Sequence, residues 1–129
     1  MGRLASLACL LLLLAACAAE DPSGPAEVTF EFRDATTSEP VAGEMTLSVV
    51  ASQTDGWSDV CWNTASGACT MEVPEGTVML ELGGEEGAPQ FDRWGECDGA
   101  KSADLSANGE PFGTIEIDGN EVTCTAFFR

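Results

Sequence analysis

Hydrophobic and polar residues alternate in several short runs after residue 26. In the first run, Val28, Phe30 and Phe32 alternate with Thr29, Glu31 and Arg33. A period of two is typical of a strand with one buried face. The other runs place apolar residues at the following positions: Met45, Leu47 and Val49; Cys69, Met71 and Val73; Val78, Leu80 and Leu82; Ile115 and Ile117; Val122, Cys124, Ala126 and Phe128. None of these runs has helical periodicity, so the pattern predicts an all-β domain over residues 27–129, a small antiparallel sandwich of about seven strands.

Turns are predicted where glycine, proline and polar residues separate these runs. Such residues occupy 37–43, 65–67 and 74–76. A longer stretch, 83–90, contains three glycines, two glutamates and a proline, which indicates a mobile loop. The last two runs are separated by Asp118-Gly119-Asn120, and these residue types tolerate the positive φ of a tight turn. This pattern predicts a β-hairpin at the end of the chain.

The first 16 residues follow a different pattern. A short start containing Arg3 precedes the apolar stretch from Leu4 to Ala16, which ends in small residues and is short for a transmembrane helix. This layout is typical of a secretory signal peptide. The residues Leu14-Ala15-Ala16-Cys17 resemble the lipobox of bacterial lipoproteins. The resemblance implies cleavage after Ala16 and attachment of a diacylglycerol to the sulfur of Cys17; an ordinary secreted protein with a chance cysteine is the alternative.

A short tether is expected between the lipid and the domain. Residues 17–26 are polar, contain proline and glycine, and show no periodicity. Each lipid methylene that enters the membrane contributes about 0.8 kcal/mol, so the acyl chains on Cys17 would give a lasting anchor. Ala18 follows Cys17, where many Gram-negative lipoproteins kept in the inner membrane have Asp. The same resemblance therefore implies an outer-membrane destination.

The charge of the chain is strongly negative. It has 22 acidic and five basic residues, a net charge of −17. Loss of Arg3 with the signal peptide leaves four basic residues against 22 acidic ones, a net charge of −18. Such a surface repels nucleic acid and anionic headgroups. It favours solubility, cationic partners or loosely held divalent ions.

Four cysteines remain after the predicted cleavage. They are Cys61, Cys69, Cys97 and Cys124. In an exported protein, an even number of cysteines predicts disulfides. Zinc is the competing interpretation, but the chain has no histidine and no CxxC pair. Two disulfides are therefore expected, with three pairings open.

Several turns resemble those of one family of domains. The stretch 34–43 has the pattern D-x-x-T-x-x-P-V-x-G, which resembles the first turn of carboxypeptidase-regulatory-like and prealbumin-like domains. The stretches 64–67 and 71–76 are similar to later turns of these domains. The stretch 120–125 is similar to the last strand of secreted prealbumin-like repeats, in which a cysteine pairs with one upstream. The resemblance implies a sandwich fold, but it implies no function, and it does not include the segment around Trp94.

The favoured disulfides are Cys61–Cys69 and Cys97–Cys124. The first would flank the turn at Gly67. The second would tie the second half of the chain to its last strand, in the manner of the resembling repeats. Each disulfide is expected to contribute roughly 2–4 kcal/mol to the stability of the domain.

The residue types argue against catalysis. Histidine and tyrosine are both missing, so Ser-His-Asp and Cys-His arrangements are excluded. Lys101 is the only lysine, and nothing near it marks it as a nucleophile. A pair of carboxylates acting as acid and base remains as an alternative, although the sequence does not select two of them. We expect a protein without enzymatic activity.

The densest polar segment is 92–99. Asp92, Glu96 and Asp98 lie close together in sequence and are candidate Ca²⁺ ligands, although the spacing is not that of an EF-hand. The alternative is an acidic turn held by the disulfide, with Trp94 folded over the bridge.

The tryptophans and methionines are candidates either for binding or for the core. Trp57 and Trp94 are candidate contacts for a peptide, a glycan or a partner protein, since exposed aromatic residues on rigid loops suit recognition. Trp62 is expected in the core, packed on a disulfide. Met45 and Met71 occupy inward positions and are also expected in the core.

These observations together predict a lipid-anchored, non-catalytic lipoprotein of the cell envelope that acts as a binding or structural interaction module. Its expected partners are the membrane, through its lipid, and an envelope protein or glycan, but not nucleic acid. A Ca²⁺-binding module is the main alternative, and a carboxylate-based hydrolase is the third.

Overall fold

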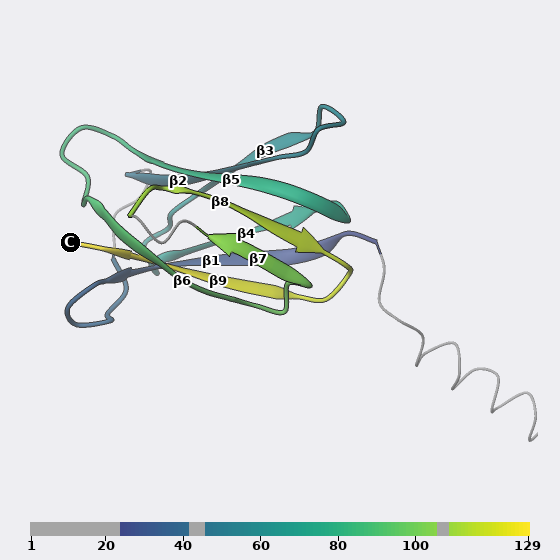
Figure 1. Ribbon diagram of the computed structural model, residues 1–129. Helices are drawn as coiled ribbons and strands as arrows, with labels where there is room; N and C mark the ends of the chain where they lie inside the picture. The colour runs from purple at the N-terminus through teal and green to yellow at the C-terminus, as the bar shows by residue number, and fades with distance from the viewer. Residues whose placement is uncertain (1–23, 42–45, 106–108) are drawn as a thin grey trace, which may run out of the picture.

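The computed structural model describes residues 24–41, 46–105 and 109–129. Within these ranges the chain forms nine strands in two sheets packed face to face, and no helix (Figure 1). The prediction of an all-β sandwich is confirmed. The predicted signal peptide, Cys17, all of the tether before Gly24, and Met45 lie outside the described residues.

The two sheets contain four and five strands. The four-stranded sheet has the order β4-β1-β9-β6, and the five-stranded sheet the order β3-β2-β5-β8-β7. The bounds in the first sheet are β1 (Ala26–Asp34), β4 (Ala68–Val73), β6 (Phe91–Asp98) and β9 (Val122–Phe128). The bounds in the second sheet are β2 (Leu47–Ser52), β3 (Ser58–Trp62), β5 (Gly76–Gly84), β7 (Ser102–Leu105) and β8 (Phe112–Ile117).

The core lies between the two sheets and is built from the alternating apolar positions. Phe30 and Phe32 of β1 are fully buried, and the ring of Phe32 lies 5.8 Å from the ring of Phe128 on β9. The facing sheet contributes Val49, Leu80 and other inward residues. Burial of each such side chain stabilises the fold by about 1.5–3 kcal/mol. The expected alternation is therefore confirmed, including the burial of Met71.

The number of strands is nine rather than about seven. The strands without a predicted run are β3, β6 and β7. The alternation of β6 is broken by two register shifts against β9, so its sequence does not follow a period of two. Strand β7 lies at the edge of the five-stranded sheet and is mostly exposed. The predicted loop 83–90 is also shorter, because β5 continues to Gly84.

The predicted terminal hairpin is wrong. The turn is present, and Gly119 has a φ of 94°. However, β8 pairs with β5 and β7, whereas β9 pairs with β1 and β6. The turn therefore carries the chain from one sheet to the other. Both strands still bury one face, but on opposite sides of the core.

The first and last strands pair with each other in the middle of the four-stranded sheet. This β1–β9 pairing is parallel and runs from Val28 opposite Val122 to Asp34 opposite Phe128. All other pairings between the described strands are antiparallel. The expectation of a purely antiparallel sandwich is therefore corrected at this one pair.

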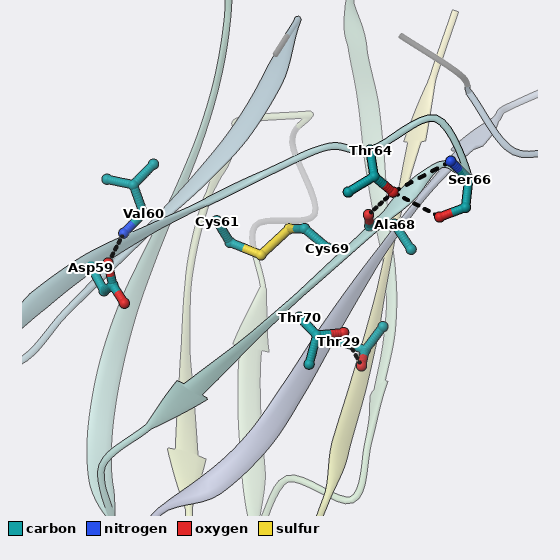
Figure 2. Close-up of a disulfide and its surroundings, with 9 residues drawn as sticks. All are labelled: Thr29, Asp59, Val60, Cys61, Thr64, Ser66, Ala68, Cys69 and Thr70. Atoms are coloured by element: carbon teal, nitrogen blue, oxygen red, sulfur yellow. Dashed lines mark hydrogen bonds between the residues drawn. A yellow bond between two sulfur atoms is a disulfide. The ribbon is translucent and has the colours of Figure 1, made fainter. Parts of the chain in front are cut away.

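Both favoured disulfides are confirmed. Cys97–Cys124 joins β6 and β9 at directly opposed positions within one sheet. Cys61–Cys69 joins β3 to β4, each of which is the edge strand of its own sheet (Figure 2). The second disulfide therefore holds the two layers together at one side of the sandwich.

The β1–β2 connection begins with a tight turn. One carboxylate oxygen of Asp34 accepts hydrogen bonds from the backbone N–H groups of Thr36 and Thr37, at 2.8 and 2.9 Å. These bonds favour the ionised form, so the pKa of Asp34 lies below its ordinary value of 3.8. The β3–β4 turn packs beside this connection: a Cβ on Gly67, which has a φ of 79°, would lie 2.6 Å from Cβ of Pro40. Glycine is therefore required at position 67.

The hydrogen bonds of Asp34 predict a pH dependence of stability. A pKa lowered by folding stabilises the native state fully above the unfolded pKa, and this contribution is lost as the pH falls through the folded pKa. Asp34→Ala should lower Tm near neutral pH; the difference from the parent should shrink as the pH falls below about 4 and should disappear below the folded pKa of Asp34. Thermal unfolding followed by circular dichroism measures the difference, with Glu27→Ala as control. A Tm difference for Asp34→Ala that stays constant from neutral pH into acid would contradict the assignment.

Candidate functional site

The outer face of the four-stranded sheet is polar. Thr29 and Thr70 are joined across β1 and β4 by a hydrogen bond of 3.0 Å, which Figure 2 shows. Thr123 extends the same row on β9. Phe127 also points outward, but the guanidinium of Arg93 lies 4.3 Å from the centre of its ring and covers it. This face has the composition expected of a solvated surface.

The outer face of the five-stranded sheet carries exposed large hydrophobic residues among its polar ones. Its exposed large hydrophobic residues, with the exposed fraction of each, are Val50 (36%), Val60 (41%), Trp62 (46%), Met79 (56%) and Phe112 (49%). They come from β2, β3, β5 and β8. We call these five residues the apolar face. They are all the exposed large hydrophobic residues of the described chain, and they lie on one side of one sheet.

The strand register brings these side chains together. Val60 lies opposite Val50 on the neighbouring strand, and Val50 lies opposite Glu81. Glu81 in turn lies opposite Phe112. Neighbouring strands are about 4.8 Å apart, so the four side chains form one row across the sheet, in which Glu81 lies between Val50 and Phe112. Met79 lies two positions from Glu81 on β5 and therefore on the same face.

A hollow of about 470 Å³ opens on this face. Val50, Met79 and Phe112 supply its large apolar surface, and Glu81 and Asp104 supply its carboxylates. The remaining lining residues are Ser52, Leu80, Gly113 and Thr114. Its volume is within the range of pockets that hold ligands or side chains of a partner.

None of the basic residues of the described chain lines this hollow. Arg33 pairs with Glu31 on β1, whereas Arg93 and Arg129 both pair with Asp92. Lys101 precedes β7 and pairs with Glu116 at 3.4 Å. Neither arginine nor lysine lines the hollow, so its electrostatic potential is set by carboxylates.

The candidate Ca²⁺ ligands are not brought together. Asp92, Glu96 and Asp98 lie along strand β6 rather than in a loop. Asp92 is engaged by two arginines, with its oxygens 2.7 and 3.3 Å from their nitrogens. Among the residues that the structure describes, no group of three His, Cys, Asp or Glu side chains is arranged to hold a metal ion. The geometry does not support a Ca²⁺ site at this segment.

The tryptophans are placed differently from the prediction. Trp94 is 8% exposed, its Nε1–H donates to the carbonyl of Phe112 at 3.0 Å, and its ring contacts that of Phe91. It therefore belongs to the core and is no surface contact. Trp57 is half-buried and packs against the core. The expectation that Trp62 is buried is wrong, because Cys61 takes the inward position of β3 and the next residue must point outward.

No catalytic arrangement is evident among the described residues. Asp34, whose pKa is lowered by its turn, is the last residue of β1 in the other sheet and does not line the hollow. The hollow contains no thiol, lysine or other strong nucleophile.

Within the described ranges, no helix is long and apolar enough to cross a membrane.

The two tryptophans Trp62 and Trp94 should differ sharply in their effect on stability. Trp94→Ala should lower the free energy of unfolding by about 3–5 kcal/mol, since it leaves a cavity in the core. Trp62→Ala should change the same quantity by no more than about 0.5 kcal/mol, since the side chain is exposed. Urea unfolding followed by circular dichroism measures both values. Equal losses in the two variants would place Trp62 in the core after all.

The fold is similar to that of a bacterial adhesin from Mobiluncus mulieris that contains intramolecular disulfide, isopeptide and ester bond cross-links. The superposition has a TM-score of 0.51 at 15% identity, and it covers 83% of this chain and 42% of the adhesin chain. This chain therefore spans less than half the length of the adhesin chain. No family model matches the sequence, and no curated protein matches it. At this identity the likeness concerns the fold alone, a β-sandwich.

Proposed function

We propose that the chain is a lipid-anchored, non-catalytic binding module of the bacterial cell envelope, and that it binds a partner protein through the apolar face. The observation that carries this proposal is the gathering of Trp62, Met79, Phe112 and two valines on one outer sheet face. The adhesin-like fold is compatible with such a role.

The fold itself does not require these five side chains to be apolar. The inner faces of the two sheets already form a closed core. The other outer face shows that polar residues such as Thr29 and Thr70 are sufficient to build a stable sheet. Exposed apolar residues gathered on one face lower solubility, and on soluble proteins such patches usually mark contact sites. We therefore assign the apolar face to contact with a partner.

The lipobox-like sequence Leu14-Ala15-Ala16-Cys17 supports the proposed anchoring. The N–H of Gly24 donates to a carboxylate oxygen of Glu75 at 2.8 Å, so the chain enters the domain beside the β4–β5 turn. Eight residues, 17–24, span at most about 25 Å. An anchored domain would therefore stay close to the membrane, with its strands leading away from the attachment point. Ala18 favours the outer membrane as the location.

The membrane would not cover the apolar face in this arrangement. Asp55, Glu75 and Asp118 lie in turns at the end of the sandwich where the tether enters. Carboxylates at this end repel anionic headgroups. The apolar face lies along the side of the domain instead, where a neighbouring envelope protein has access.

Lipidation can be tested by metabolic labelling in the native host. The full chain should incorporate labelled palmitate, and Cys17→Ser should abolish the incorporation, because the thioether forms at this sulfur. Cys9→Ser is the matched control, since Cys9 lies inside the predicted signal peptide and its loss should leave labelling unchanged. Labelling that persists in Cys17→Ser, or that is missing from the parent, would refute the anchor.

The apolar face can be tested by photo-crosslinking in living cells. A benzoylphenylalanine at position 79 or 62 should form a specific adduct with an envelope protein on irradiation. The same residue at position 70 or 123, on the polar face of the other sheet, should not form that adduct. Equal adducts from both faces, or none from the apolar face, would contradict the assignment of this surface.

A further inference from the structure

A second hollow continues the first one toward the tether end of the domain. It has a volume of about 450 Å³ and shares Ser52, Met79 and Thr114 with the first. Its other lining residues are Gln53, Thr54, Asp55, Glu75, Gly76 and Thr77. Because three residues are common to both, the two hollows form one continuous depression along β5. We call it the trough.

The two ends of the trough differ in chemistry. One end is apolar and is formed by Val50, Met79 and Phe112, with Glu81 and Asp104 at its side. The other end is polar and holds the carboxylates of Asp55 and Glu75. Among the residues that line the trough there are four carboxylates and no arginine or lysine.

The acidic end is held in place by hydrogen bonds between turns. The side-chain amide of Gln53 donates to the carbonyl oxygens of Pro74 and Glu75, at 3.3 and 2.8 Å. This ties the β2–β3 turn to the β4–β5 turn. The carboxylate of Asp55 accepts a hydrogen bond from the N–H of Trp57 at 3.1 Å, which fixes this carboxylate within the β2–β3 turn. The acidic end is therefore built into the fold.

We propose that the trough binds a short segment of the partner protein in which apolar side chains are followed by lysine or arginine. This proposal rests on the proposed function and names the class of partner. The apolar residues would occupy the end near Phe112, and the basic residues would lie beside Asp55 and Glu75. From Glu81 to Gly76 the trough follows β5 for roughly 17 Å, the length of about five extended residues.

Charge argues against three acidic occupants of the trough: a second copy of this chain, a fatty acid and an anionic lipid. A second copy of this chain would bring a strongly acidic surface against four carboxylates, since its own charge is −17 even with Arg3 present. Fatty acids and anionic lipids carry negative groups and meet the same repulsion. A cationic segment gains from the same field, which raises its rate of association and its specificity.

The partner class is tested with synthetic peptides and the oxidised chain from Ala18 onward. This chain contains all nine strands and both disulfides. The probe is a short peptide with leucines in its first half and lysines in its second half. One matched peptide has glutamate in place of every lysine, and another has serine in place of every leucine. Heteronuclear NMR titration at low salt gives the affinity and the residues affected.

The lysine peptide should shift the resonances of Met79, Phe112, Asp55 and Glu75, and each matched peptide should bind at least about tenfold more weakly. Asp55→Lys with Glu75→Lys, which reverses the charge where the basic residues would lie, should reduce the affinity by about tenfold or more. Glu27→Lys with Glu72→Lys is the control, because it changes the net charge equally on the opposite face, where the two residues are neighbours. The control pair should change the affinity by less than about threefold.

Each contrary outcome is distinct. Equal losses of affinity in the two charge-reversed variants would show that the peptide is attracted by the net charge of the domain. This result would refute the trough as the binding site. Equal binding of the lysine and glutamate peptides would show that the partner segment need not be basic. The assignment of the apolar face as a contact surface would be unaffected. Self-association of the chain at high concentration, detected by sedimentation and abolished by Met79→Ser, would show a second copy as the occupant. Photo-crosslinking from position 79 reports on the proposed function separately from all three.

Discussion

The structure depends on the burial of one face of each sheet against the other. Phe30, Phe32 and Phe128 form the centre of the four-stranded layer, and the inward residues of β2, β5 and β8 cover them. A strand sends alternate residues to opposite faces, so this core also fixes which side chains point to solvent. The core leaves the outer faces open to any residue type. Among the residues that the structure describes, the exposed large hydrophobic ones all lie on the outer face of the five-stranded sheet.

Two covalent links limit how the layers can move. Cys61–Cys69 ties the sheets together at one side, and Cys97–Cys124 holds β6 against β9 beside the bulged part of that pairing. For a domain of this size, two disulfides at roughly 2–4 kcal/mol each form a large share of a net stability of about 5–15 kcal/mol. They allow a modest core to support a rigid surface. A rigid apolar face loses little conformational entropy when a partner binds.

The sequence predicted the features that follow from local pattern and missed those that depend on pairing. The alternation around Val28 and Leu80 identified the core strands, and the cysteines indicated both disulfides. Strand β6 was not predicted because its bulges break the period of two. The predicted terminal hairpin was wrong because a tight turn at Gly119 can also join strands of two different sheets. For Trp62 a usable signal was present: once Cys61 is assigned to the inside, period two sends its neighbour outward. The trough combines residues from four strands and two turns, and no local pattern reports such a combination.

The central position of the β1–β9 pair has a consequence for biogenesis. Strand β1 is made first and β9 last, so a chain emerging in order of synthesis presents one edge of β1 without its partner until the final residues appear. Contacts of such long sequence separation form slowly, and exposed strand edges invite aggregation in the interval. Deletion of β9 would therefore remove a central strand of the four-stranded sheet rather than an edge strand.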